Sequence, residues 1–304
     1  MLICSAVASS LFAAVTFSGF GDVSEVGDQS VQEAGLISTD QTDSVGRSEP
    51  AMEKTQQSLT VEKEHYLGRA VASQILRNYA PPYQPKANAY LNLLGQSLAV
   101  FSDRPETFAG YRFLLLDSDE VNAFGAPGGF ILVTRGMIRC CENEDELAAV
   151  LAHEICHIQN QDGLRVIQQE HITEALTMLN SESGPQFGDV RSGSLPPEFE
   201  VLVSDIVRAL TISGYSPKQE QQADADAMEL LRRSGYPEMA MITLLNRMDE
   251  RLNKAGALGF AKTHPVAASR AKAARTIVEE AESSPDSTRQ QRFAVAMGSV
   301  VTGG

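Results

Sequence analysis

Two histidines, His153 and His157, lie four residues apart with a glutamate, Glu154, directly after the first. Apolar residues recur at steps of three and four through residues 144–160, which predicts a helix. On a helix, positions i and i+4 lie on the same face, so both imidazoles can direct a ring nitrogen at one ion. Zinc accepts such nitrogens, and in catalytic sites it takes three protein ligands and leaves one position to water. Glu154 is placed to take a proton from that water, so the pattern predicts a zinc-dependent hydrolase, most often a peptidase.

A third ligand would distinguish this site from a helix that merely exposes two histidines and a glutamate. Gly163 stands where metzincins carry a further histidine, which excludes that class. Asp162 and Glu170 are close in the chain, but neither has a helical context that directs it back at the pair. A more distant residue is therefore the better candidate.

A second helix is predicted to begin at Pro217, because Ser216 can cap its N-terminus and Gln219 completes a capping box. On this helix Glu220 and Asp224 share a face with alanines. A long acidic side chain on a face of small residues can approach another helix. Glu220 therefore fits the third zinc ligand, and Asp224 fits an acceptor that holds a ligand histidine by its other ring nitrogen. An acidic solvent face is the alternative that these residues leave open.

The two predicted helices belong to a set of four segments that follow one another along the chain. The segments are the stretch 122–138, which contains N-A-F-G-A-P-G-G, the pentapeptide 153–157, the run 220–224, and T-H-P at 263–265 followed by Arg270. Together they resemble peptidase family M48, the gluzincins that include the Ste24 and HtpX enzymes and their soluble periplasmic relatives. The resemblance covers about residues 61–274. It implies Glu220 as the third ligand, Glu154 as the base, and a role for His264 close to the metal.

The first of these segments resembles the strand signature of the family. An edge strand next to a zinc site is a common means of holding an extended peptide by main-chain hydrogen bonds. We therefore predict a substrate-binding strand that includes Asn122, Ala123, Phe124, Gly128 and Gly129, with the glycines allowing close approach of backbones. A plain hairpin turn is the alternative.

The chain departs from the family pattern beside the second histidine. Cys156 stands where family members commonly have glycine, and residues 159–162 read Q-N-Q-D where many carry a histidine or an arginine. Cysteine can be a soft metal ligand. Because its side chain leaves the helix about 100° from that of His157, we expect a small packed residue instead.

Charge and length limit the partners and the organisation of the chain. A formal net charge of −14 over 304 residues argues against nucleic acid, whose phosphates require Lys and Arg, and against electrostatic attachment to anionic lipid. We predict four parts: an apolar segment, a disordered acidic linker, the peptidase-like domain and a loose C-terminal tail. Their bounds are 1–20, 21–58, 59–282 and 283–304.

The apolar segment at residues 1–20 resembles the core of a secretory signal, although it lacks a basic start. It is short for a membrane span, and no multi-span pattern follows it. We predict export, and the resemblance to soluble family members implies the bacterial periplasm or envelope. Membrane association remains open.

Periodicity predicts a mainly α fold of the α+β class. The predicted helices are 61–79, 87–101, 144–160, 164–180, 198–212, 217–234, 237–254 and 264–282, the strands are 111–117 and 130–134, and 181–197 is a mobile loop. The resemblance implies a zincin-like metallopeptidase domain with a small β-sheet beside the zinc helix.

The predicted function is a zinc-dependent endopeptidase with one zinc ion per chain, which hydrolyses peptide bonds through a metal-bound water. His153, His157 and Glu220 would hold the ion, Glu154 would act as base, and His264 would stabilise an oxyanion or lie beside the metal. The resemblance implies protein quality control in the envelope, acting on unfolded or misassembled proteins. Two alternatives remain: a latent chaperone-like or regulatory protein whose site is plugged by His264 or the 181–197 loop, and a structural metal-binding domain.

Overall fold

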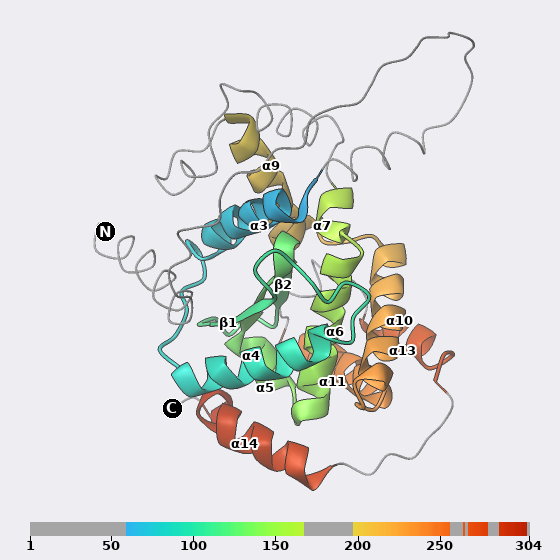
Figure 1. Cartoon of the computed structure of the whole chain (residues 1–304). Coiled ribbons are helices and arrows are strands. Elements are labelled where there is room, and N and C mark those ends of the chain that lie inside the picture. The colour runs from blue at the N-terminus through green and yellow to red at the C-terminus, as the bar shows by residue number, and fades with distance from the viewer. Residues whose placement is uncertain (1–58, 167–196, 256–263, 265–266, 279–285, 303–304) are drawn as a thin grey trace, which may run out of the picture. The chain divides into compact units, whose positions relative to one another are not determined.

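The computed structural model describes residues 59–166, 197–255, 264, 267–278 and 286–302 (Figure 1). The predictions for 1–20 and 21–58 lie outside these residues, as do those for 181–196 and for most of the predicted helix 164–180. The bounds proposed for the domain at 59–282 stay a prediction.

Helices dominate the described part of the chain, and a small sheet accompanies them. The helices are α3 (Val61–Ile75), α4 (Pro85–Ala99), α5 (Arg135–Cys140), α6 (Glu144–Gln159), α7 (Asp162–Arg165), α9 (Pro197–Arg208), α10 (Pro217–Arg233), α11 (Met239–Ala255), α13 (Ala267–Ala274) and α14 (Ser287–Thr302), with short turns η1 (Pro127–Gly129) and η3 (Ala209–Ser213). The predicted mainly α fold with a small sheet is confirmed. The helix predicted from residue 264 begins only at Ala267, so His264 lies outside it.

The sheet contains the two strands predicted from periodicity and a third at the position of the predicted substrate-binding strand. Its order is β1 (Arg112–Leu116), β3 (Phe130–Thr134), β2 (Ala123–Ala126), with β1 parallel and β2 antiparallel to β3. Gly125 and Ala126 belong to β2, and the short turn η1 follows from Pro127. β2 is short, contains a glycine and shows no alternation, so only its pairing with β3 defines it. Every residue of β3 is buried, which explains its continuous apolar run.

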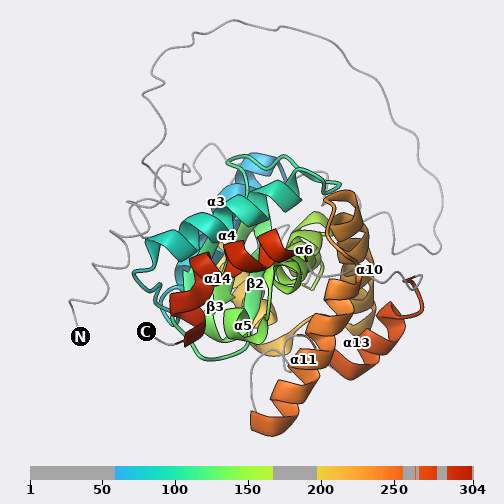
Figure 2. The ribbon, with the colours of Figure 1, turned by 90° about the horizontal axis from the view of Figure 1, so that it is seen from below.

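α6 is the central helix of the fold. It packs against α10, α11, α4 and β2 (Figures 1 and 2), and every residue from Glu146 to Ile158 is buried. Asn143 caps its N-terminus by accepting a hydrogen bond from the Glu146 backbone N–H. Because α6 is surrounded, even its polar side chains must find partners within the protein.

The C-terminal residues form a packed helix, so the prediction of a loose tail was wrong. On α14 the side chains of Phe293, Met297 and Val300 share one face and are buried in the core. Arg292 donates to the buried carboxylate of Glu144 at 3.0 Å, which ties α14 to the start of α6 (Figure 2). The apolar stripe was hidden in the sequence by polar and small residues between its members. None of the described helices is long and apolar enough to cross a membrane.

Candidate active site

Four side chains from three places in the chain meet beside the middle of α6. His153 and His157 come from α6, Glu220 from α10, and His264 from the segment before α13; their ligand atoms all lie within 4.8 Å of one another, and all four side chains are buried. His153 Nε2 is 3.0 Å from His157 Nε2 and 3.7 Å from Glu220 Oε2. His157 Nε2 is 3.6 Å from Glu220 Oε1.

These distances fit a tetrahedral zinc ion. Bonds of about 2.0–2.1 Å to nitrogen and oxygen place two tetrahedral ligand atoms roughly 3.4 Å apart. Burial, followed by the charge of His157, lowers the pKa of His153 to about 4, so its ring is neutral at ordinary pH and can offer a lone pair. The donor set of two imidazoles and one carboxylate therefore suits zinc.

Glu154 lies next to this group with one oxygen uncommitted. The side chain is buried, and Oε1 has no hydrogen-bond partner among the described residues. β2 passes so close that a Cβ on Gly125 would lie 3.0 Å from Glu154 Oε2. Burial raises the pKa of Glu154 to about 7. A buried carboxyl with a pKa in this range is suited to accept and return a proton.

Asp224 lies one turn beyond Glu220, and its Oδ1 is 3.1 Å from Nδ1 of His153. Arg270, from α13, joins the two acids of α10: its Nη1 is 2.7 Å from Glu220 Oε2, and its Nε donates to Asp224 Oδ2 at 2.7 Å. Burial, the largest single influence, raises the pKa of Asp224, but the charge and hydrogen bonds of Arg270, together with the contact with His153, outweigh it and lower this pKa to about 2. The arginine thereby allows two buried carboxylates to remain ionised side by side.

His264 reaches the group from the segment that precedes α13. Its Nδ1 is 2.8 Å from Glu220 Oε1 and 3.5 Å from His153 Nε2. The structure therefore places the side chain next to the proposed metal position, where the sequence resemblance implied it.

The residues of the predicted substrate strand fall into two parts of the structure, β2 and the turn η1 that follows it. Ala123 and Phe124 belong to β2, the strand at one end of the sheet order and beside α6. Phe124 is itself buried, with its ring 5.3 Å from that of Tyr79. Asn122 accepts a hydrogen bond from its neighbour's N–H, Ala123 N, at 2.9 Å and donates to Glu120 at 3.2 Å, which shapes the start of the strand.

Gly128 and Gly129 follow β2 in η1, and their nearest neighbours lie in α3 and in the segment before β1. The Gly128 N–H donates to Glu64 on α3 at 3.0 Å, and a Cβ at this position would lie 2.6 Å from His65 Cα. A Cβ at Gly129 would lie 3.3 Å from Tyr111 Cα, which is closer than ordinary van der Waals contact. Both glycines have positive φ. Their contacts are those of close backbone packing rather than of the site.

Cys156, the unusual residue of the zinc helix, is fully buried in the apolar core and is not part of the ligand group. Two residues that we did not assign to the site contact His157. Asp162 Oδ2 is 2.8 Å from its Nδ1, and the ring of Tyr215 stacks on the imidazole at 4.2 Å. The only sign of this contact in the sequence is that Asp162 follows His157 by five residues, and from the sequence we considered Asp162 as a possible metal ligand only.

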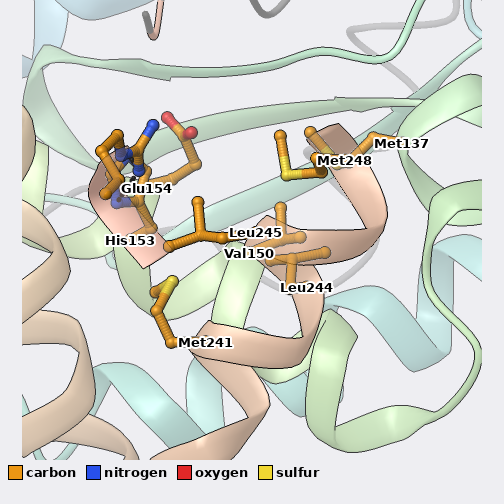
Figure 3. A pocket seen from close by; sticks show the side chains of 9 residues that line it. Met137, Val150, His153, Glu154, Met241, Leu244, Leu245 and Met248 are labelled. Carbon is orange, nitrogen blue, oxygen red and sulfur yellow. Dashed lines mark hydrogen bonds between the residues drawn. The ribbon is translucent and has the colours of Figure 1, made fainter. Parts of the chain in front are cut away.

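A small apolar pocket lies beside the face of α6 that carries the histidines and extends one turn toward the N-terminus of this helix. Val150, His153 and Glu154 form one wall, and the facing wall comes from α11. The other lining residues are Met137, Met241, Leu244, Leu245, Met248 and Arg270. Figure 3 shows His153 and Glu154 at one end of the pocket and Met137 and Met248 at the other. An apolar group in this pocket would lie directly beside the candidate base.

The fold and the site together define a class of protein. A central helix that carries H-E-x-x-H, a small sheet beside it and a second helix that brings a glutamate to the histidines form the arrangement of a metalloendopeptidase domain. A family model described as Peptidase family M48 matches residues 85–278. The chain belongs to this family.

Named relatives agree with that assignment. The beta-barrel assembly-enhancing protease of Yersinia pestis is 27% identical over 242 residues, covering 77% of this chain and 47% of the relative. The protein of the same name from Escherichia coli K12 is 28% identical, covering 72% and 44%. The mitochondrial metalloendopeptidase OMA1 of Schizosaccharomyces pombe is 32% identical over 145 residues, covering 47% and 40%. The chain thus spans less than half the length of these relatives.

Proposed function

We propose that this protein is a zinc-dependent endopeptidase in which His153, His157 and Glu220 hold one zinc ion and Glu154 acts as general base. The observation that carries this proposal is the buried group of ligand atoms within 4.8 Å of one another, with the uncommitted oxygen of Glu154 beside it. A structural zinc site would normally be closed by four cysteine or histidine ligands and would not need a neighbouring unpaired carboxyl.

The residues of the chain divide the work of hydrolysis. Zinc, when bound, polarises the scissile carbonyl and acidifies the attacking water. Glu154 takes a proton from that water and later delivers it to the leaving amine. Asp224 holds His153 by its second ring nitrogen, and Arg270 keeps Glu220 and Asp224 in place. We assign His264 to the neighbourhood of the reacting carbonyl, as a group that contacts the oxyanion or the metal.

Unfolded or misassembled proteins are the substrates that we propose. The relatives named beta-barrel assembly-enhancing protease support a role in quality control of proteins in the bacterial envelope. We accordingly propose that this protein is exported and acts in the periplasm or at the envelope. The net charge of −14 agrees with protein rather than nucleic acid as partner.

The apolar pocket supports the same class of substrate. As it stands the pocket has room for about one water molecule. Because it touches both His153 and Glu154, we propose that it receives the side chain next to the scissile bond once its methionines move aside. Its methionines are flexible and can adapt to different apolar groups. Such side chains are buried in folded proteins and become available when a protein is unfolded.

Shortening a methionine of this pocket should change the cleavage preference. In Met241→Ala we expect a preference for larger apolar side chains at the scissile bond, by about tenfold, since one methylene in an apolar pocket is worth roughly 10–200-fold in discrimination. Mass spectrometry of fragments from a denatured protein would measure it. Met228→Ala is the matched control, because Met228 is as buried as Met241 and does not line the pocket. An unchanged pattern in Met241→Ala would refute the assignment.

Metal removal tests the proposed activity directly. We expect the purified protein to contain one zinc ion per chain and to cleave an unfolded protein such as reduced casein. Phenanthroline should abolish cleavage, and added zinc should restore it, because without the ion the attacking water is not activated. Cleavage that persists in the metal-free protein would contradict a zinc mechanism.

The same experiment addresses the latent alternative, in which His264 or the 181–197 loop plugs the site. The family match and the named proteases do not favour it. Stoichiometric zinc without any cleavage by the wild-type protein would support it instead.

A further inference from the structure

The turn after the zinc helix returns a carboxylate to one of the two histidines. α6 ends with Asn160 as its C-cap, Gln161 adopts a left-handed conformation with φ 55°, and α7 begins at Asp162. This turn directs the Asp162 side chain back to α6, where Oδ2 lies 2.8 Å from His157 Nδ1. Asp162 is only 1% exposed, so water offers it no substitute for the histidine.

The second oxygen of Asp162 contacts the other ligand helix. Gln219 Nε2 donates to Asp162 Oδ1 at 3.1 Å. Gln219 is also the capping-box residue of α10: its Oε1 accepts from the Ser216 backbone N–H at 3.1 Å. It directly precedes Glu220. One carboxylate therefore connects His157 on α6 to the first turn of the helix that carries Glu220.

We propose that Asp162 is a positioning residue for His157 and, through Gln219, fixes the two ligand helices relative to each other at the metal. This inference rests on the proposed function, since it takes His157 as a zinc ligand. An acceptor at Nδ1 keeps the imidazole proton on that nitrogen and leaves the Nε2 lone pair free for the ion. Tyr215, stacked on the ring at 4.2 Å, limits its rotation.

Each of the two histidines then has a carboxylate at its Nδ1, but the two carboxylates have different partners of their own. His153 is held by Asp224, whose charge is shared with Arg270. His157 is held by Asp162, whose second contact is the neutral amide of Gln219. The Asp162 carboxylate can therefore polarise its imidazole more strongly than a carboxylate already paired with a guanidinium.

The test is zinc affinity of the full chain, measured by competition with a coloured chelator. In Asp162→Asn we expect zinc to bind about 10–100-fold more weakly, as is typical when a partner of a ligand histidine is lost. At saturating zinc the variant should recover most of its kcat with an unchanged KM, because Glu154 is untouched. Asp162→Glu, which keeps the charge, should restore part of the affinity.

Asp226→Asn is the matched control. Asp226 also links α10 to the end of α6, by accepting from Asn160 Nδ2 at 2.8 Å, but its contacts in the described part of the chain do not include His153 or His157. Its variant should bind zinc as the wild type does. Wild-type affinity in Asp162→Asn, or equal weakening in both variants, would overturn the positioning role while leaving the peptidase intact. Absence of zinc binding by the wild type would overturn the proposed function as well.

Discussion

Replacing Glu154 by glutamine should lower kcat for cleavage of an unfolded protein by about 10²–10⁴-fold, the usual contribution of a general base. Glutamine has nearly the same shape but cannot take the proton of the attacking water. The zinc content should remain at the wild-type level, since Glu154 is outside the group of ligand atoms. The loss would therefore be one of chemistry rather than of metal.

Cleavage rates and metal content of the same purified preparations would measure this effect. Glu146→Gln provides the control, because Glu146 is a second buried carboxylate on α6 and pairs with Arg247 away from the site. It should reduce stability while retaining kcat. If Glu154→Gln cleaves as fast as the wild type, the proposed base is wrong.

Glu220→Gln should lose both zinc and activity, whereas Glu154→Gln should lose activity alone. A glutamine oxygen is a neutral and weaker donor than a carboxylate, and it replaces the only acid of the proposed ligand set. We expect zinc affinity to fall by more than the ~10–100-fold that the loss of an outer partner costs. Arg270 would also lose one of its two buried acidic partners, which should lower the free energy of unfolding by about 1–3 kcal/mol.

Metal analysis after dialysis, together with chelator competition, would establish the loss. Glu229→Gln is the control on the same helix, since Glu229 pairs with Arg232 and Arg233 far along α10. It should keep both zinc and activity. Retention of wild-type affinity in Glu220→Gln would exclude Glu220 as a ligand.

Glu154→Gln and Glu220→Gln separate the role of the base from that of the metal ligand, because they make the same chemical change at two neighbouring positions. Each neutralises a buried carboxylate next to His153 and His157 without changing its size. One variant should keep the metal and the other should lose it. A structural zinc domain would lose its metal in Glu220→Gln but would show no cleavage to lose in Glu154→Gln.

Local sequence rules were sufficient for the helices that carry the site. The three- and four-residue spacing of apolar residues predicted α6 almost to its ends, and Ser216 with Gln219 predicted the start of α10, where the structure has a complete capping box. The face shared by Glu220 and Asp224 followed from helix geometry, and both point to the histidines of α6. Such features depend on neighbours within one or two turns.

Other features depend on contacts between distant segments, and the sequence did not reveal them. The bounds of β2 are set by its pairing with β3, and α14 is held by Glu144, about 150 residues earlier in the chain. Gly128 lies in a close approach to the backbone of α3. The left-handed conformation of Gln161 turns Asp162 toward His157, although no local rule favours that conformation for glutamine.

By itself, the sequence determined the residues of the proposed chemistry: the pair of histidines, the candidate base between them and the acidic helix that completes the set. The tertiary structure decided which side chains support that chemistry. A ligand's type and spacing are encoded over a few residues of one helix, so they can be read directly. The contact of Asp162 with the second nitrogen of His157 arises from the turn between α6 and α7, and the neighbours of Glu154 and the pocket beside it arise where distant segments pack together; these are set only by the folded chain.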